Sequence, residues 1–217
     1  MNALLYSILT LQNMNYLIIA SMWIAYCLLH SFLISISFTN LMTRLLRDYY
    51  VFYRIFFVSL SLALLIPLIR YTDQFDSNII ITYNPFLNSI RYILIIGSLS
   101  MFFWAFFIDY DSLSFFGIRQ LLSFIKQEGI KTPGDLKRKG LLGIVRHPMY
   151  FALIVYLWCT TSTMTDIIVN IVLTIYIFLG TIYEEKKLIL EFGDAYVKYQ
   201  HEVPMLIPYT KSLVRSS

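Results

Sequence analysis

The chain has 217 residues, of which 58% are hydrophobic and 14% are charged, with 17 Lys and Arg against 13 Asp and Glu. Soluble domains carry about a quarter charged residues, so this composition excludes an ordinary soluble protein and predicts an integral membrane protein. The formal net charge of +4 is accounted for by basic residues that flank membrane spans and contact anionic lipid headgroups. We expect no nucleic-acid partner.

Four apolar stretches predict where the chain crosses the membrane. They are residues 16–35, 51–69, 90–108 and 149–183. The first three each match the roughly 20 residues that a helix needs to cross a bilayer. The fourth is too long for one crossing, and its polar middle, CTTSTMTD, divides it into a helical hairpin. The sequence therefore predicts an all-α integral membrane protein with about five transmembrane helices.

Basic residues predict the orientation of these spans. With this arrangement, every Lys and Arg except Arg70 and Arg91 falls on one side of the membrane, which the positive-inside rule assigns to the cytoplasm. We therefore expect a multi-pass cell membrane protein with its N-terminus outside and its C-terminus in the cytoplasm. Residues 1–13 contain no Lys or Arg, which argues against a cleaved signal peptide. Residues 1–110 would form a three-helix transmembrane part, and residues 111–217 the functional part.

Outside the spans, two segments have helical spacing. FFGIRQLLSFIKQEG, residues 115–129, has apolar residues on one face and Gly129 as a natural helix end, so we expect a helix on the membrane surface. The tail from 184 to 201 repeats the pattern, and VPMLIP, residues 203–208, is expected to return as extended chain because its prolines cannot continue a helix. His30, near the end of the first span, is interpreted as a packed or interfacial histidine.

The most informative stretch is GLLGIVRHPMYF, residues 140–151. Proline disfavours a helical residue before it and suits the first turn of a helix, so Pro148 should begin the fourth span. Arg146 and His147 then lie at a helix N-terminus, where free N–H groups and the helix dipole favour an anion. Taken alone, Arg146 is better explained as an anchor of the span at the lipid headgroups.

The far end of the hairpin carries a pair of carboxylates, Glu184 and Glu185. At about 1.5 Å per residue, the two arms of the hairpin return to a similar depth, which brings this pair close to Arg146, His147 and Tyr150. Glu–Lys pairing within EEKK explains those four residues but not their placement opposite RHP. The combination indicates a pocket for a ligand that carries charges of both signs. The two cysteines and three histidines have no metal-ligand spacing, so we expect no metal.

In order, RHPMY, a short helical hairpin and EE–L–FG–Y–Y–VP–IP resemble the C-terminal half of the membrane methyltransferase superfamily. This superfamily includes isoprenylcysteine carboxyl methyltransferases, phospholipid N-methyltransferases and NnrU-like proteins. The resemblance covers residues 140–208. LLHSF (28–32), FFGIRQ (115–120) and TSTMT (161–165) are also similar to bacterial methanethiol S-methyltransferases.

The resemblance implies an S-adenosyl-L-methionine pocket on the cytoplasmic side, open to a small or lipophilic methyl acceptor from the membrane. It implies cofactor binding by nine residues: Leu136, Gly140, Arg146, His147, Pro148, Met149, Tyr150, Glu184 and Glu185. A sulfonium cation suits aromatic faces. Arg119 and Gln120 are catalytic candidates, the first to favour a thiolate and the second to orient the acceptor. We expect direct methyl transfer, with the acceptor a methanethiol-like thiol.

Three departures from the superfamily pattern keep alternatives open. Leu142 and Gly134 stand where relatives often have tyrosine and histidine, which leaves a non-catalytic NnrU-like accessory protein possible. Gly180 and Thr181 stand where enzymes that act on prenylcysteine carboxylates have an arginine. That difference disfavours a prenylcysteine carboxyl acceptor, with an amino-lipid as a further alternative. The oligomeric state is not indicated.

Overall fold

A computed structural model of the chain describes residues 2–75, 79–126, 136 and 138–210, with side chains from residue 13 onward. The described helices are α1 (Asn2–Ile34), α2 (Ile36–Leu46), α3 (Tyr53–Asp73), α4 (Pro85–Trp104), α5 (Ser112–Phe115), α6 (Ile118–Ile125), α7 (Pro148–Thr160), α8 (Met164–Phe192) and α9 (Asp194–Glu202). Short 3₁₀ helices η1 (Arg47–Phe52) and η3 (Gly140–Gly143) and the π-helical η2 (Ala105–Asp109) complete the set. Gly129 and Gly134 lie outside the described residues.

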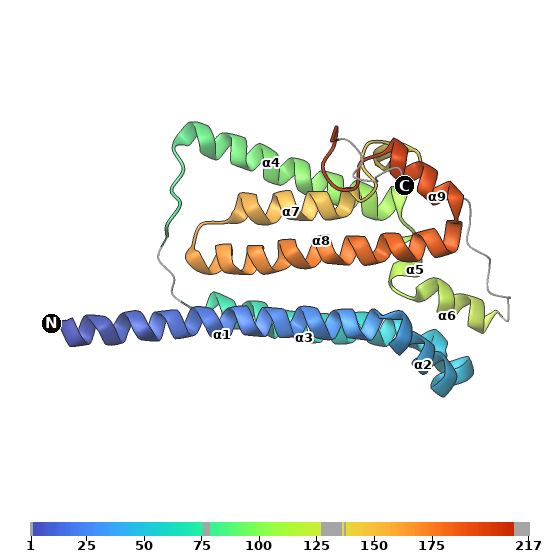
Figure 1. Cartoon of the computed structure of the whole chain (residues 1–217), viewed down its shortest axis with the longest axis horizontal. Coiled ribbons are helices and arrows are strands. Elements are labelled where there is room, and N and C mark those ends of the chain that lie inside the picture. Colours follow the sequence, from blue (N-terminus) through green and yellow to red (C-terminus); the bar gives the residue numbers. More distant parts are fainter. Residues whose placement is uncertain (1, 76–78, 127–135, 137, 211–217) are drawn as a thin grey trace. The chain divides into compact units, whose positions relative to one another are not determined.

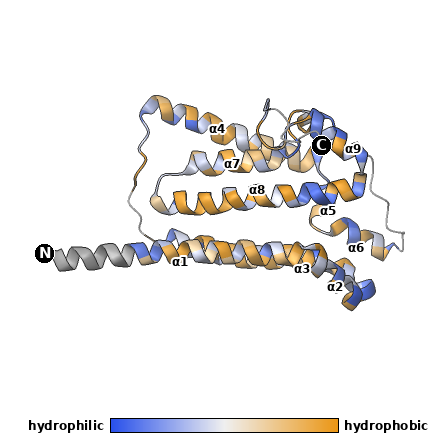
Figure 2. Ribbon diagram, viewed as in Figure 1, coloured by the Kyte–Doolittle hydropathy of each residue, from blue (hydrophilic) through white to orange (hydrophobic). Residues whose placement is uncertain are grey.

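Four helical stretches of the described chain are long and apolar enough to cross a membrane: Asn13–Ile34, Ile36–Asp73, Pro85–Asp109 and Met164–Phe192. The shorter α7 is also apolar. The predicted all-α membrane fold is therefore confirmed, with α7 as a fifth apolar helix. Figure 2 shows hydrophobic residues along most of these helices and hydrophilic residues gathered in α9 and near the end of α8.

The chain divides into two compact units, each described here by itself. One contains Met1–Thr82 and Thr161–Tyr176, and the other contains Tyr83–Thr160 and Ile177–Ser217. In the first unit, α1 packs along α3 (Figure 1), with Ile19, Trp23 and Leu68 buried together. In the second unit, α7 packs along α4 (Figure 1).

The predicted turn of the hairpin is confirmed, but the helix after it is longer than expected. α7 ends at Thr160 and α8 begins at Met164, and the carboxylate of Asp166 accepts hydrogen bonds of 2.9 Å from the backbone N–H groups of Ser162 and Thr163. Free N–H groups at a helix start are stabilised by such a side chain. α8 runs on to Phe192, about 44 Å of helix, which exceeds the thickness of the hydrocarbon core.

Two predicted helices are interrupted at glycines. The expectation of one helix over 115–129 is wrong, because Gly117 has φ 81° and separates α5 from α6. The expectation of one tail helix over 184–201 is also wrong, because Gly193 has φ 57° and separates α8 from α9. Only glycine adopts this left-handed region without strain, so both breaks follow from the residue type.

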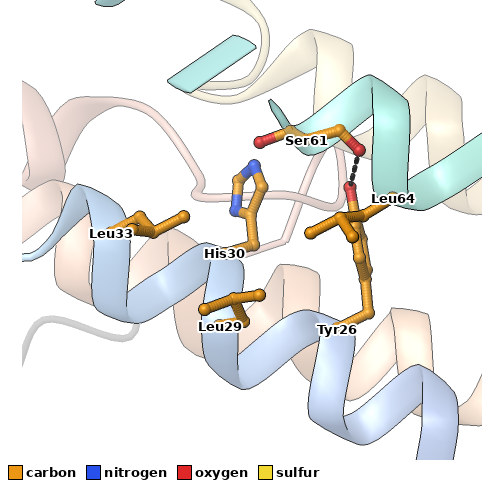
Figure 3. Close-up of a pocket in the computed structure, with 6 residues that line it drawn as sticks. All are labelled: Tyr26, Leu29, His30, Leu33, Ser61 and Leu64. Atoms are coloured by element: carbon orange, nitrogen blue, oxygen red, sulfur yellow. Dashed lines mark hydrogen bonds between the residues drawn. The ribbon is translucent and has the colours of Figure 1, made fainter. Parts of the chain in front are cut away.

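The histidine of the first span is a packed residue, as expected. His30 Nδ1 lies 2.7 Å from the Tyr176 hydroxyl, and its ring lies 4.9 Å from that of Phe57 between centroids. Figure 3 shows it in a small pocket with Tyr26, whose hydroxyl donates to the backbone oxygen of Ser61. The pocket is too small to hold a water molecule, so it is no candidate for a ligand site.

Candidate functional site

The segment before α7 is held by the returning C-terminal chain. The backbone N–H of Arg146 donates to the carbonyl of Pro204 at 2.9 Å, and the N–H of His147 donates to that of Met205 at 3.1 Å. The return predicted for VPMLIP is confirmed at these two residues. Pro148 then begins α7 as its first residue and is buried, so the backbone direction of Arg146 and His147 is fixed on both sides.

Arg146 points into the protein interior. Its side chain is 3% exposed, and Nε donates to Glu185 Oε1 at 2.6 Å. Nη1 donates to the carbonyl of Gln200 at 2.9 Å and also to that of Val203. The guanidinium therefore ties α8 to the end of α9 and to the segment that follows it.

Glu185 is the centre of this buried network. Besides the bond from Arg146, its Oε2 accepts a hydrogen bond of 2.9 Å from Gln200 Nε2, and its Oε1 lies 3.2 Å from His147 Nε2. The Tyr196 hydroxyl lies 3.5 Å from Oε1. A buried carboxylate with several donors is held ionised in one orientation. We call Arg146, His147, Glu185 and Gln200 the buried network.

Glu184 belongs to a more open edge of the same cluster. Its side chain is 35% exposed, against 10% for Glu185. The Tyr150 hydroxyl donates to Glu184 Oε2 at 2.7 Å, and the Tyr150 ring stacks on that of His147 with 5.6 Å between centroids and 10° between planes. We call Tyr150, Glu184 and the facing side of His147 the open edge. The predicted meeting of RHPMY with the paired glutamates is thus confirmed.

One nitrogen at this edge makes no hydrogen bond. His147 is 2% exposed, and its Nδ1 has no hydrogen-bond partner among the described residues; Glu184 Oε2 is 4.0 Å away. Buried polar atoms are nearly always hydrogen-bonded. A buried unbonded nitrogen beside a partly exposed carboxylate and two stacked rings is what a site for a polar, cationic ligand would present.

The loop before RHP supports the cluster. Gly140 has φ 66°, and a Cβ added there would lie 3.0 Å from Asp109 Oδ1 at the end of η2. The Tyr199 hydroxyl donates to the Leu142 carbonyl at 2.5 Å, and burial raises the pKa of Tyr199 to about 12. The Tyr199 hydroxyl therefore fixes the backbone of the loop at Leu142.

Of the other predicted site residues, Leu136 and Met149 lie near the buried network, and Arg119 and Gln120 lie in α6. Leu136 packs on the cluster of Tyr196, Tyr199 and Val203, and Met149 is half-buried in the first turn of α7. Both tyrosines of that cluster are buried.

Arg119 and Gln120 belong to α6, and their side chains contact residues at the start of α5. Arg119 Nε pairs with Asp111 at 2.6 Å, with the side chains 53% and 40% exposed, and Gln120 Nε2 donates to the Ser114 carbonyl at 3.4 Å. Burial works against ionisation of Asp111, but hydrogen bonds from Ser114 and Arg119 lower its pKa. These contacts join neither residue to the open edge.

Two contributing residues were not anticipated. The sequence predicts only that Gln200 lies in a helical tail, whereas in the structure its side chain donates a hydrogen bond to Glu185. Asp109 ends an apolar stretch and is buried against Gly140. An acidic residue at the end of an apolar run was the available signal for Asp109, whereas the direction of Gln200 depends on the turn at Gly193.

The helices and the cluster together define a class: a helical membrane protein with a charged, hydrogen-bonded network where the start of α7 meets the second half of α8. Within that class, the chain is similar to proteins named methanethiol S-methyltransferase. It is 36% identical over 118 residues to methanethiol S-methyltransferase 1 of Bradyrhizobium diazoefficiens, covering 54% of this chain and 40% of that protein.

Two further relatives carry the same name. The protein of Pseudomonas deceptionensis is 37% identical over 94 residues, 43% of this chain and 36% of its own length. That of Crocosphaera subtropica is 35% identical over 95 residues, 43% of this chain and 37% of its own length. The matches thus span well under half the length of these curated relatives. No family model and no solved structure matches the chain.

Proposed function

We propose that the chain is an S-adenosyl-L-methionine-dependent methyltransferase of the membrane that converts a small or lipophilic thiol, such as methanethiol, to a thioether. The similarity to proteins named methanethiol S-methyltransferase supports this proposal most directly. When bound, S-adenosyl-L-methionine would supply a methyl group on a positively charged sulfur. The residues of the open edge fit such a ligand, because it carries a sulfonium, an ammonium and hydroxyl groups.

In this proposal the glutamates have different roles. Glu184 is partly exposed and would bind the ammonium or a hydroxyl of the donor, with Tyr150 orienting the carboxylate. Glu185 is occupied by Arg146 and Gln200 and would hold the frame. The stacked rings of Tyr150 and His147 would face the cationic end of the donor.

The remaining predicted residues would shape the pocket. Pro148 and Met149 would line it at the start of α7, and Leu136 and Gly140 from the preceding loop. Methyl transfer to a thiol needs no covalent enzyme intermediate, so the rate would come from aligning the two reactants and from excluding water. The acceptor-side roles of Arg119 and Gln120 stay predictions. The basic residues around the cluster support a cytoplasmic site.

An observation on α8 favours a thiol over a carboxylate acceptor. Thr181, one turn before Glu185, is buried, and its hydroxyl donates to the carbonyl of Ile177 at 2.7 Å. In the superfamily that the chain resembles, enzymes that act on prenylcysteine carboxylates have an arginine about one turn before the paired glutamates, and Thr181 supplies no cation there.

The first test is calorimetry with S-adenosylhomocysteine on detergent-purified protein. We expect saturable binding that Glu184→Gln weakens at least tenfold. Glu191→Gln is the matched control, because Glu191 is an exposed carboxylate on the same helix. Absence of binding to the folded wild type would contradict the proposal and favour an accessory protein.

The second test identifies the acceptor. Wild type with S-adenosyl-L-methionine and methanethiol should release dimethyl sulfide, measured by gas chromatography. A prenylcysteine and an amino-lipid serve as competing acceptors, and methylation of either in place of the thiol would contradict the acceptor class.

A further inference from the structure

The contacts of Glu185 determine which ring nitrogen of His147 carries a hydrogen. The inference drawn from this rests on the proposed function. His147 Nε2 lies 3.2 Å from Glu185 Oε1, and that carboxylate already receives bonds from Arg146 at 2.6 Å and from Gln200 at 2.9 Å. An ionised carboxylate accepts hydrogen bonds only, so Nε2 must carry the hydrogen. In the neutral ring, Nδ1 then carries a lone pair.

That lone pair faces the open edge. Nδ1 is buried and makes no hydrogen bond with any described residue. The group facing it is the carboxylate of Glu184, 4.0 Å away, which itself accepts a hydrogen bond from Tyr150. Nδ1 is thus an acceptor atom that the folded chain leaves for something outside the described protein.

We propose that His147 Nδ1 removes the proton of the thiol acceptor during methyl transfer. The thiol gives its proton to Nδ1 while its sulfur forms a bond to the methyl carbon, and the bond from that carbon to the donor sulfur breaks. The donor sulfur leaves with the electron pair as a neutral thioether. The imidazolium is stabilised by Glu185 and then returns its proton to water.

The other groups around the ring are less suited to this step. Arg146 remains protonated, and Glu185 is occupied by its donors. The Glu184 carboxylate is engaged by the Tyr150 hydroxyl. The Tyr196 hydroxyl lies 3.5 Å from Glu185 Oε1, and its ring packs against that of Tyr199. Imidazole is also the side chain whose protonation changes near neutral pH.

The arrangement assigns supporting roles within the network. Glu185 fixes which ring nitrogen is protonated, and Arg146 with Gln200 fixes Glu185. A base oriented by a carboxylate is the general pattern by which proteins activate a nucleophile. Glu185 is therefore a positioning residue, and His147 is the catalytic one.

The kinetic test compares His147→Gln with wild type on two thiols of similar size, ethanethiol and 2,2,2-trifluoroethanethiol. Gln keeps an N–H group to donate to Glu185 but removes the base. The fluorinated thiol is more acidic and needs less help to lose its proton. We expect kcat for ethanethiol to fall about 10²- to 10⁴-fold, and the loss for trifluoroethanethiol to be at least about tenfold smaller. Affinity for S-adenosylhomocysteine is measured for both proteins, and kcat is compared at saturating S-adenosyl-L-methionine, because the proposed function also places the His147 ring beside the donor.

Two kinetic results would overturn the inference. Equal losses for both thiols would show that proton removal is not the function of His147. A wild type that binds S-adenosylhomocysteine but methylates neither thiol would also overturn it, whereas absence of binding would refute the proposed function itself.

Nitrogen NMR of histidine-labelled wild type gives a readout independent of activity and of the stability of the variant. The chain has three histidines, so few signals need assignment. We expect the neutral His147 ring to carry its hydrogen on Nε2. A neutral ring protonated on Nδ1 would contradict the inference.

Discussion

Among the arginine–carboxylate pairs of the described residues, Arg146–Glu185 and Arg119–Asp111 have the same Nε–oxygen distance but differ in burial, and this difference gives a stability prediction. The Nε–oxygen distance is 2.6 Å both in Arg146–Glu185 and in Arg119–Asp111. The side chains of the first pair are 3% and 10% exposed, and those of the second are 53% and 40% exposed. We therefore expect Arg146→Met and Arg119→Met to have very different effects on the free energy of unfolding.

The magnitudes follow from what each substitution leaves behind. Removing one partner of a buried pair costs about 3–5 kcal/mol because an uncompensated charge stays in the interior. Arg146→Met leaves Glu185 in that position and also removes a donor from the carbonyls of Gln200 and Val203. Removing an exposed pair costs about 0–1 kcal/mol, because solvent screens both charges. Arg119→Met is therefore the matched control.

The assay is reversible unfolding in mixed micelles by titration with dodecyl sulfate, followed by far-ultraviolet circular dichroism. The double substitution Arg146→Met with Glu185→Leu tests the cause, because it removes the stranded charge. We expect it to be less destabilising than Arg146→Met alone. If Arg146→Met costs no more than Arg119→Met, the cluster is not a dry ionic network and the assignment of Arg146 to the frame is refuted.

Three further stability changes are expected from single contacts. Gly140→Ala should destabilise by about 1–3 kcal/mol, because it forces a left-handed φ and places a Cβ 3.0 Å from Asp109 Oδ1. Tyr199→Phe should cost about 1–3 kcal/mol by leaving the carbonyl of Leu142 without its donor. Asp166→Ala should cost about 1 kcal/mol by removing the side-chain cap at the start of α8. The micelle titration described above measures all three.

Each of these changes has a control within the chain. Gly180→Ala should be neutral or mildly stabilising, because Gly180 is helical and a Cβ there meets nothing within 4 Å. Tyr209→Phe should be neutral, since Tyr209 is exposed. Asp166→Asn should retain most of the stability because asparagine also caps helices. A control as damaging as its test substitution would contradict the contact invoked for that test.

The hairpin and its paired ends could be predicted from sequence because they depend on short-range features. Apolar length, a polar turn and a proline at residue 148 fix where α7 begins and where the chain reverses. The contact between Tyr150 and Glu184 then follows from the rise per residue of two helices. Contacts with residues outside the hairpin are not needed to predict that Tyr150 and Glu184 meet.

The roles within the cluster could not be predicted in the same way. Glu184 and Glu185 are neighbours on a helix, so their side chains point about 100° apart, and the sequence does not state which one faces inward. The direction of Arg146 depends on carbonyl groups at 200 and 203, which reach it only after the turn at Gly193. The expectation that Arg146 binds an anion did not take these two carbonyl groups into account.

The pairing of Arg146 and His147 with Pro204 and Met205 has a consequence for biosynthesis. The backbone donors of the RHP segment have their partners nearly sixty residues later, so a nascent chain inserted through α7 and α8 cannot yet complete the cluster. A chain cut before Pro204 would keep both helices of the hairpin but lack the two carbonyl groups that fix the backbone of Arg146 and His147. Ligand binding should therefore arise late in synthesis, after the tail has left the ribosome.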